Sequence, residues 1–576
     1  MSARCVGDSG LAPPCERKGE GGPVLTMNAA LEAADIVWFD VCKTLFIRPL
    51  VEPEHLFDLV GASVGMPDFR ARRVAAEALA RQQAGGDQPF TLDLIYANLE
   101  ASQTERNLAK RTECRFELAL WLPSPRVEAM FRETAANGRA ALAGSTHLPA
   151  AFFEELLAQH SLPQVPLFLS HDGTGSPDAA ALAMRIAHEL DVAPERIFHL
   201  ADDFAEDSPP DRDPLPLPLE GAASVAFGLK RLASGLPAGS CEALGFHVGG
   251  PVVTGFLHWL DQQARRDNID LLLLCPGVGT AVERVSQHPD APQLSRHGYF
   301  CIGPSVIMLA GTHDRNFDTR IDMLLAGAHG LRTFELLQRL DVPAPASFVL
   351  ADIGLGDDVI IDSTTEPLLR RFLGAYRWEI LKVARRNRRG LFRSLLDHGL
   401  APKMRVALVD IGWDGTLLES FVQALEHMFD VEIFGYCLCL LDNQESRRRQ
   451  GRFNLKGLFS RASLPAERLE SIGANRAAIE LLFTPPHREI IGLDDLPTAV
   501  QPIESGIGPS SERLEAVSTE VTDGIAAFAA PFNTFCTRAR FQPEPMAVCQ
   551  PFLAVAADAM TVAGPVLAAL AKPAEL

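Results

Sequence analysis

The order of apolar and polar positions divides the first part of the chain into alternating strands and helices. Apolar runs of strand length end in small or polar residues, and stretches with apolar residues at helical spacing separate them. A last short run, at 223–227, is also expected to be a strand. This alternation predicts a parallel, doubly wound α/β sheet. The main strands are expected at Ile36–Asp40, Ala140–Ser145, Pro166–His171 and Arg196–Asp203.

The same pattern divides the chain into domains. Helical spacing over about 52–135 predicts a helical cap, inserted after the first strand of a Rossmann-like domain that spans 33–235. A second Rossmann-like α/β domain is expected over 236–500. A helical C-terminal region is expected over 501–576.

The two ends of the chain bear on its location. Residues 1–32 are rich in Gly, Pro and charge, which is typical of a disordered leader, with translation starting at either Met1 or Met27. The most apolar late segment, 551–571, is interrupted by Asp558 and by a proline, so a helix pair is expected there and not a membrane span. We therefore expect a cytoplasmic protein.

Charge and cysteine content narrow the class of function. The 576 residues carry a net charge of −20, which argues against a nucleic-acid binder or a binder of anionic membranes, since either needs a basic face. The 11 cysteines form no CxxC pair and no cluster at zinc spacing, which indicates reduced thiols. Cys437 and Cys439, two positions apart, are expected in the core on one face of a buried strand.

Carboxylates follow two of the predicted strands in the first domain. Asp40 ends the first strand, and Thr44 follows it four positions later in the stretch IVWFDVCKTLF. Asp202 and Asp207 follow the fourth strand. Because ligands bind outside the carboxyl ends of parallel strands, these carboxylates are expected to converge. Mg²⁺ prefers such oxygen ligands, together with substrate phosphate.

This spacing resembles that of the haloacid dehalogenase (HAD) superfamily. The first motif of that superfamily is matched by Asp40 and Thr44, and its fourth motif by Asp202 and Asp207. The resemblance implies a nucleophilic Asp40 that forms an aspartyl intermediate in Mg²⁺-dependent hydrolysis of phosphate esters. The residues it implies are Asp40, Thr44 and Ser145 for catalysis, and Asp40, Cys42, Asp202 and Asp207 for the metal.

The chain departs from the superfamily at three positions. Cys42 stands where HAD phosphatases have the Asp that acts as general acid and base, and a thiol is a poor proton donor to a leaving alkoxide. Gly144 stands at the second motif, with Ser145 directly after it. The third motif, over 171–178, has no Lys or Arg, and the nearest cation downstream is Arg185. The motifs therefore keep a metal shell and lack the parts that transfer protons.

Two histidines offer a replacement for the missing acid and base. His147 and His171 both follow strands of the predicted sheet, on the same edge as Asp40. A structural role for both is the alternative.

A narrower resemblance is to the large HAD-like proteins encoded with bacterial capsule and O-antigen genes. It rests on FDVCKTLFIRPLVEPEHLFDLV and on later motifs, and it covers most of 33–490. It implies a role in surface-polysaccharide biosynthesis, with a sugar phosphate or related metabolite as substrate and glycosyltransferases as partners. Two segments depart from the group, Leu271–Gly279 and Cys301–Leu309.

The second domain carries its own site-like element, VALVDIGWDGTLLESF. A buried strand ends at Asp410, Gly412 and Gly415 allow tight turns, and Thr416 opens a helix whose N-terminus favours an anion. These residues predict a site for a phosphorylated small molecule or a nucleotide sugar. The alternative is a strand-to-helix turn with a satisfied cap.

A basic stretch precedes this element, at Arg377–Arg393. Arg385, Arg389 and Arg393 share one helical face, which either attracts the anion or is an ordinary solvated face. The sequence thus supports two hypotheses. The protein is a HAD-type hydrolase, or it is a catalytically degenerate relative that binds a phosphorylated ligand or serves as a scaffold for polysaccharide enzymes.

Overall fold

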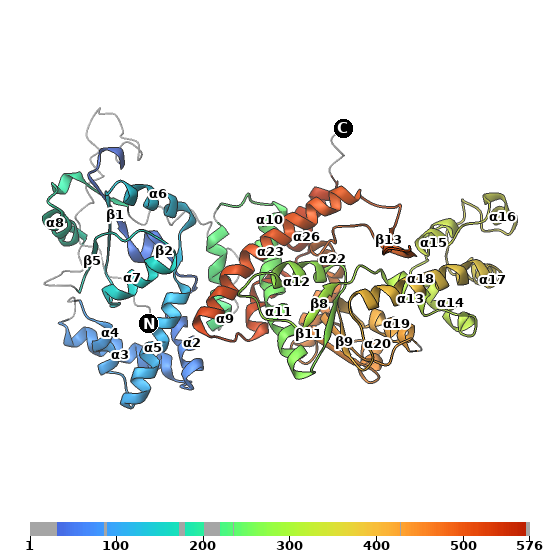
Figure 1. Cartoon of the computed structure of the whole chain (residues 1–576), viewed down its shortest axis with the longest axis horizontal. Coiled ribbons are helices and arrows are strands. Elements are labelled where there is room, and N and C mark those ends of the chain that lie inside the picture. Colours follow the sequence, from blue (N-terminus) through green and yellow to red (C-terminus); the bar gives the residue numbers. More distant parts are fainter. Residues whose placement is uncertain are drawn as a thin grey trace. The chain divides into compact units, whose positions relative to one another are not determined.

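The computed structural model describes residues 31–85, 89–171, 179–200, 219, 221–233, 235–426 and 428–571. The chain separates into two compact units, each with its own parallel sheet (Figure 1). The predicted α/β class with parallel strands is confirmed. The first unit holds 1–47, 78–95 and 123–206, and the second holds 48–77, 96–122 and 207–576.

The first sheet has four parallel strands in the order β5-β4-β1-β6. Trp38 and Phe39 of the central strand are at most 3% exposed, as expected for a parallel sheet covered on both faces. The strand order reverses between β1 and β6, so the topological switch point lies between them. The elements are β1 (Ile36–Asp40), β4 (Ala140–Gly144), β5 (Leu167–Leu169), β6 (Ile197–Leu200), α6 (Pro125–Ala136), α7 (Ala150–Gln159) and α8 (Ala179–Leu190).

One predicted strand is wrong. Residues 223–227 belong to the helix α9 (Gly221–Leu229), in which all nine residues are buried. A helix buried on every side shows no apolar periodicity, so a short apolar run does not distinguish it from a buried strand.

The helices expected as a cap on the first domain divide between the units. Residues 48–77 and 96–122, which include α2 (His55–Val64) and α5 (Gln103–Leu120), group with the second unit. Phe116 of α5 packs its ring edge against Phe535 and Phe541, with ring centroids 5.8 Å apart in both pairs. Two further helices lie between α2 and α5 in the sequence. They are α3 (Phe69–Gln83) and α4 (Leu92–Ala97).

The second sheet has five parallel strands in the order β11-β10-β9-β7-β8. In chain order this is a 2-1-3-4-5 arrangement, in which the direction of winding reverses between β7 and β9. A ligand is expected outside the carboxyl ends of those two strands. The strands are β7 (Leu271–Leu274), β8 (Arg296–Tyr299), β9 (Arg405–Trp413), β10 (Glu432–Leu440) and β11 (Asn454–Phe459).

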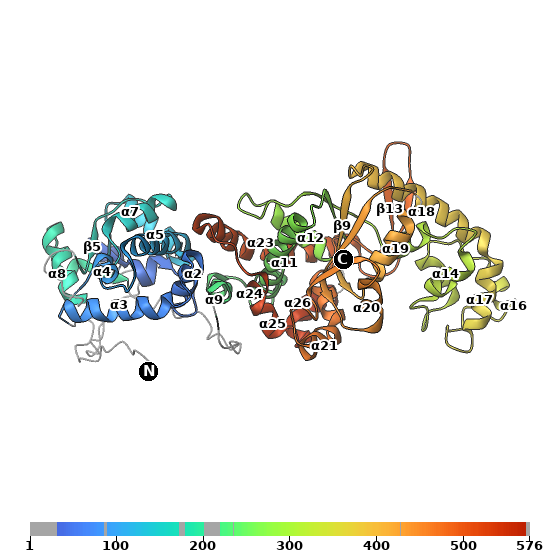
Figure 2. The same cartoon turned by 90° about the horizontal axis from the view of Figure 1, so that it is seen from below.

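Alternate residues of these strands face two separate cores. Leu272 and Val409 face a core shared with α11 (Gly250–Arg266), α12 (Val278–Ser286) and α23 (Ser511–Ala539). Leu273 and Leu408 face a core shared with α13 (Pro304–Ala310), α18 (Arg377–Asp397) and α19 (Thr416–Leu425). Figures 1 and 2 show these two layers of helices on opposite sides of the sheet. The period of two along each strand produces this division.

A helical insert between β8 and β9 has a small core of its own. It ends in α18, which also packs against the hairpin of β12 (Ile490–Asp495) and β13 (Val500–Glu504). The described chain from Ser511 to Ala571 is helical apart from short connections. No helix in the described part of the chain is long and apolar enough to cross a membrane. The remaining elements are α14 (Phe317–Leu325), α15 (Thr333–Arg339), α16 (Ser347–Asp352), α17 (Glu366–Ala375), α20 (Gln444–Gln450), α21 (Ala466–Ala474), α22 (Arg476–Leu482), α24 (Pro545–Val548), α25 (Gln550–Val555) and α26 (Ala559–Ala571).

Candidate functional site

The first sheet presents Asp40 at the end of its central strand. A short π-helical turn, Val41–Leu45, follows, and the Cys42 N–H donates to Asp40 Oδ1 at 2.8 Å. The buried Thr44 donates its hydroxyl hydrogen to the carbonyl oxygen of Leu200, the last residue of β6, at 3.1 Å. The turn is therefore tied to the neighbouring strand at the switch point.

The predicted metal ligands are only partly within the structure. Asp202 and Asp207 lie outside the described residues. Among the residues that are described, no three His, Cys, Asp or Glu side chains are grouped as metal ligands. Asp40 and Cys42 are the predicted ligands that can be placed: Asp40 ends β1, and the Cys42 N–H of the following turn donates to it.

Gly144 is the residue of β4 that lies beside this turn. A Cβ added to it would lie 3.6 Å from Val41 Cβ and 3.8 Å from Cys42 Sγ, which are ordinary contact distances. Ser145, the predicted catalytic hydroxyl, is one residue further on and exposed. The position that a second-motif hydroxyl would take is thus open but holds no side chain.

The nearby imidazole and guanidinium groups have structural partners. His171 Nδ1 lies 2.9 Å from the carbonyl oxygen of Thr146, one residue before His147. Arg185 donates to the carbonyl oxygen of Leu169 and to Glu189, at 3.1 and 2.7 Å. Arg185 is therefore shared between the end of β5 and its own helix.

The second sheet has a pocket of about 340 Å³ at its switch point. We call it the switch-point pocket. Cys275 follows β7, Asp410 lies near the end of β9, and His487 lies in the loop before β12. Apart from these, from Arg488 and from Glu489, the lining is apolar or consists of glycine and proline. The residues of that lining are Pro276, Ile302, Gly303, Pro304, Leu417, Pro485, Ile490, Ile507, Pro509 and Leu514.

Asp410 is one of the two carboxylic acids that line this pocket, with Glu489. Enclosure by protein raises the pKa of its carboxyl to about 6, against the opposing effect of the Ile411 and Gly412 N–H groups. The Gly412 N–H lies 3.2 Å from Oδ2. Repulsion from Glu480 and Asp414 raises the pKa further. Asp410 can therefore take up and release a proton near neutral pH.

Two thiols lie against Asp410. Burial raises the pKa of Cys275 and of Cys437 well above the usual range, and the negative charge of Asp410 raises both further. Both thiols are therefore neutral at physiological pH. Cys437 and Cys439 are both buried in β10, as predicted. The expectation that they share one strand face is wrong, because Cys437 belongs to the core beside α18 and Cys439 to the core beside α11. Leu438 and Cys439 both face the α11 side, so the alternation along β10 is interrupted there.

His487 is held in one tautomer by its neighbours. Its Nδ1 lies 2.7 Å from the Arg488 carbonyl oxygen, so Nδ1 carries the hydrogen. Its Nε2 then accepts from the hydroxyl of Tyr299 at 2.7 Å, and Cys301 Sγ lies 3.4 Å away. Burial raises the pKa of Cys301 to about 11, so this thiol is also neutral. These contacts orient the His487 ring where it lines the pocket.

The predicted anion site at the start of α19 is filled by the chain itself. Asp414 Oδ1 accepts the N–H and the hydroxyl hydrogen of Thr416 at 2.9 and 2.7 Å. Arg449 lies 3.3 Å from the other oxygen of Asp414. The helix terminus thus has an internal carboxylate where a phosphate was expected. This is the capped turn that the sequence left open as the alternative.

The two glycines of this turn are needed for packing. Gly412 and Gly415 have φ values of +103° and +77°, which favour glycine. A Cβ on Gly412 would lie 2.5 Å from Cys437 Cβ, and one on Gly415 would lie 2.4 Å from Leu455 Cδ2. Both glycines are therefore accounted for by backbone conformation and close packing, without a ligand.

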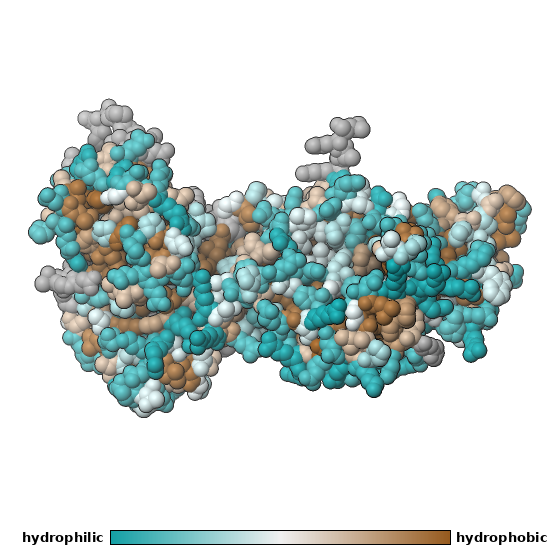
Figure 3. Space-filling view, in the orientation of Figure 1, coloured by the Kyte–Doolittle hydropathy of each residue, from teal (hydrophilic) through white to brown (hydrophobic). Residues whose placement is uncertain are grey.

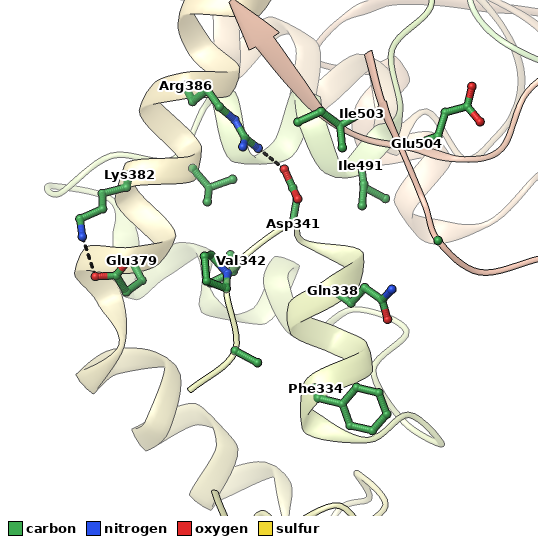
Figure 4. Close-up of a pocket in the computed structure, with 14 residues that line it drawn as sticks. Phe334, Gln338, Asp341, Val342, Glu379, Lys382, Arg386, Ile491, Ile503 and Glu504 are labelled. Carbon is green, nitrogen blue, oxygen red and sulfur yellow. Dashed lines mark hydrogen bonds and ion pairs between the residues drawn. The ribbon is translucent and has the colours of Figure 1, made fainter. Parts of the chain in front are cut away.

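A second pocket, of about 680 Å³, lies between α15, α18 and the β12–β13 hairpin (Figure 4). Arg386 reaches from α18 toward Asp341, with which it forms an ion pair. Gly492 leaves room for the pair, since a Cβ there would lie 2.6 Å from Asp341 Oδ2. No motif in the sequence pointed to this pocket, because four separate segments line it.

Sequence reasoning also missed most of the switch-point pocket. Cys275 lies in a segment named above only as a departure from the family, and His487 lies in none of the motifs named above. Their convergence on Asp410 depends on the strand order, which the sequence does not display. No family model matches the chain, and no curated protein matches it. The HAD resemblance therefore rests on sequence motifs and stays a prediction.

Proposed function

We propose that the protein binds a small metabolite in the switch-point pocket and that Asp410 exchanges a proton with it. The observation that carries this proposal is an enclosed carboxyl, with its pKa raised to about 6, facing a mostly apolar pocket at the switch point of the sheet. Raised carboxyl pKa values in clefts are a mark of functional sites, since keeping such a group costs stability.

The lining favours a hydroxyl-bearing or amine-bearing ligand over a phosphate ester. Asp410 and Glu489 both line the pocket. Of the described lining residues only Arg488 is a permanent cation, and its Nε donates to the Pro509 carbonyl oxygen at 2.6 Å. A phosphate would be repelled by the ionised carboxylates, whereas hydroxyl and ammonium groups donate to them.

Calorimetric titration of four ligand classes tests this proposal. The panel holds neutral sugars, primary amines, sugar phosphates and nucleotide sugars. We expect the first or second class to bind, and Asp410→Asn to weaken that binding tenfold or more. Asp397→Asn, an exposed carboxylate at the end of α18, is the matched control. Binding of phosphorylated ligands alone, unaffected by Asp410→Asn, would refute the proposal.

The second candidate function is Mg²⁺-dependent hydrolysis of a sugar phosphate or related metabolite at Asp40. It is supported by the turn after β1, where Cys42 N–H orients Asp40 and Thr44 is tied to β6. Asp40, Asp202 and Asp207 would hold the ion, which would neutralise the phosphate. In that reaction Asp40 would attack phosphorus. Cys42 cannot supply the proton that the leaving group needs.

A phosphatase screen with Mg²⁺ tests this second candidate. We expect turnover lower by about 10²–10⁴-fold than in an enzyme with an intact acid and base, the range that general acid–base catalysis contributes. Cys42→Asp alone should recover little, because the second-motif hydroxyl is also absent at Gly144. Any turnover should disappear in Asp40→Asn. Activity that persists in that variant would exclude Asp40 as the nucleophile.

A further inference from the structure

One face of α18 forms a regular line of exposed side chains, which we call the α18 seam. Its residues are spaced 4, 3, 4, 3 and 4 positions apart, so at about 100° per residue they lie within about 40° of a single line. The seam is about 27 Å long, at about 1.5 Å per residue. Its members are Trp378, Lys382, Arg385, Arg389, Phe392 and Leu396.

The seam is uncovered along its whole length. Trp378 is 67% exposed, Phe392 41% and Leu396 46%. The side chains of Lys382 and Arg389 are 70% and 68% exposed, and Arg385 is exposed as well. A spacing of alternating fours and threes is the one at which one helix packs along another. The opposite face of α18 is buried in the protein, at Ile380, Ala384, Asn387, Leu391 and Leu395.

Some arginines of α18 are bound within the protein, and others are exposed on the seam. Arg388 donates to the carbonyl oxygens of Ala310 and Thr312, and Arg386 pairs with Asp341, as Figure 4 shows. These two face the protein.

The cations of the seam form few hydrogen bonds or ion pairs within the protein. Lys382 pairs with Glu379 of its own helix at 2.7 Å, and Arg389 pairs with Asp495 at 2.8 Å. Arg385 makes no hydrogen bond or ion pair within the described part of the chain. Three consecutive positions of the seam are therefore positive in a chain with a net charge of −20.

The C-terminal end of the seam borders a groove of about 510 Å³. Phe392, Leu396 and Met428 supply its apolar lining, and the Phe392 ring stacks on Phe429 at 5.0 Å. In Figure 3 an apolar patch lies beside a strongly hydrophilic strip, where Figure 1 labels α18 and α19. A groove of this kind accepts an apolar side chain from a helix laid along the seam.

We propose that the α18 seam docks an acidic amphipathic helix of a partner protein. Carboxylates of that helix would lie opposite Lys382, Arg385 and Arg389. Apolar residues at its two ends would cover Trp378 and enter the groove beside Phe392. The charge complementarity selects this occupant, and the net charge of the whole chain disfavours a nucleic acid. This inference is independent of the ligand in the switch-point pocket.

Tryptophan fluorescence of the full chain provides the test. Of the 5 tryptophans, three are at most 8% exposed and Trp259 is partly buried, so Trp378 is the one that iodide reaches most readily. The probe is a synthetic three-heptad peptide with Glu at the central facing positions and Leu at the two ends. We expect this peptide to protect Trp378 from iodide quenching.

Charge reversal on the seam should abolish most of this protection. Arg385→Glu with Arg389→Glu should weaken peptide binding tenfold or more. The matched control is Arg315→Glu with Arg371→Glu, which makes the same change in net charge at two exposed positions off the seam. Circular dichroism and melting temperatures check that both double variants fold. Phe392→Ser should weaken binding without any change in charge.

Several outcomes would overturn the proposal. Equal protection by a peptide in which Ser replaces Leu would reduce the effect to charge attraction. Stronger protection by a DNA or RNA duplex would assign the seam to nucleic acid. Sedimentation showing self-association that the seam double variant abolishes would assign it to a second copy of the chain. Equal affinity of wild type and the seam double variant would remove the site.

Discussion

The two sheets of this protein place an aspartate beside the switch point in different surroundings. Asp40 ends β1 and precedes a π-helical turn whose Thr44 donates to the neighbouring strand β6. Asp410 faces a pocket of about 340 Å³, and burial raises its pKa to about 6. Both follow an apolar run that reads alike in the sequence. An aspartate near the carboxyl end of a strand therefore marks a place in the fold, while its surroundings decide its chemistry.

The glycines beside the two aspartates should differ most in their tolerance of a side chain. Gly415→Val adds a Cβ 2.4 Å from Leu455 Cδ2 at a φ of +77°, so we expect a loss of about 3 kcal/mol or more in the free energy of unfolding. Gly144→Ser meets ordinary contacts and should cost about 0.5 kcal/mol or less. Urea unfolding of both variants measures the difference. Similar losses would mean that the two turns are equally tight.

Thr44 and Thr416 should show the next largest difference, in the stability that is lost when the hydroxyl is removed. Thr44→Val leaves the Leu200 carbonyl oxygen without its hydroxyl partner at a site only 4% exposed, and should cost about 1–3 kcal/mol. The comparison is with Thr416→Val, which removes an exposed hydroxyl that donates to Asp414 Oδ1, and the expected cost there is about 0.5–1 kcal/mol. Thermal unfolding at one pH compares the two. A larger loss at Thr416 would reverse the ranking and favour a tightly built site at α19.

Asp414→Ala bears on the predicted phosphate site. The substitution removes the carboxylate that caps α19, so it should cost about 1 kcal/mol. If the helix terminus can also take a ligand, this variant should bind inorganic phosphate while wild type does not. Calorimetry with phosphate distinguishes the cases. Phosphate binding by wild type itself would restore the anion site predicted from the sequence.

The sequence predicts the parts of the fold that depend on local pattern. The runs that end at Asp40 and near Asp410 are apolar throughout and are strands in the structure. The helix at 223–227 was missed because full burial removes its periodicity. His487 and Cys275 reach the pocket through tertiary packing of distant segments, which no local pattern encodes.

Local sequence pattern also limits what can be predicted about the buried cysteines and about the N-terminus of α19. Cys437 and Cys439 were expected in the core and lie there, but the period of two placed them on one face while the structure places them in different cores. The occupant of the α19 terminus was left open, because glycine and threonine at these spacings suit a phosphate and a carboxylate cap equally. Only the position of the Asp414 side chain distinguishes the two.

The pH dependence of stability in wild type and Asp410→Asn tests the central claim most directly. The carboxyl has an ordinary pKa of 3.8 and a folded pKa of about 6, so the folded state holds its proton to higher pH. Its contribution to stability is present below pH 3.8 and is lost as the pH rises through about 6.

At about 1.4 kcal/mol per pKa unit, Asp410→Asn should be more stable than wild type by up to about 3 kcal/mol above pH 6. The difference should shrink to near zero below pH 4. Urea unfolding across pH 3.5–8 measures it, with Asp397→Asn as the control. A gain that grows from pH 4 to pH 7 supports an enclosed, proton-exchanging carboxyl in the switch-point pocket. A difference independent of pH, or a loss of stability at pH 7, would contradict it.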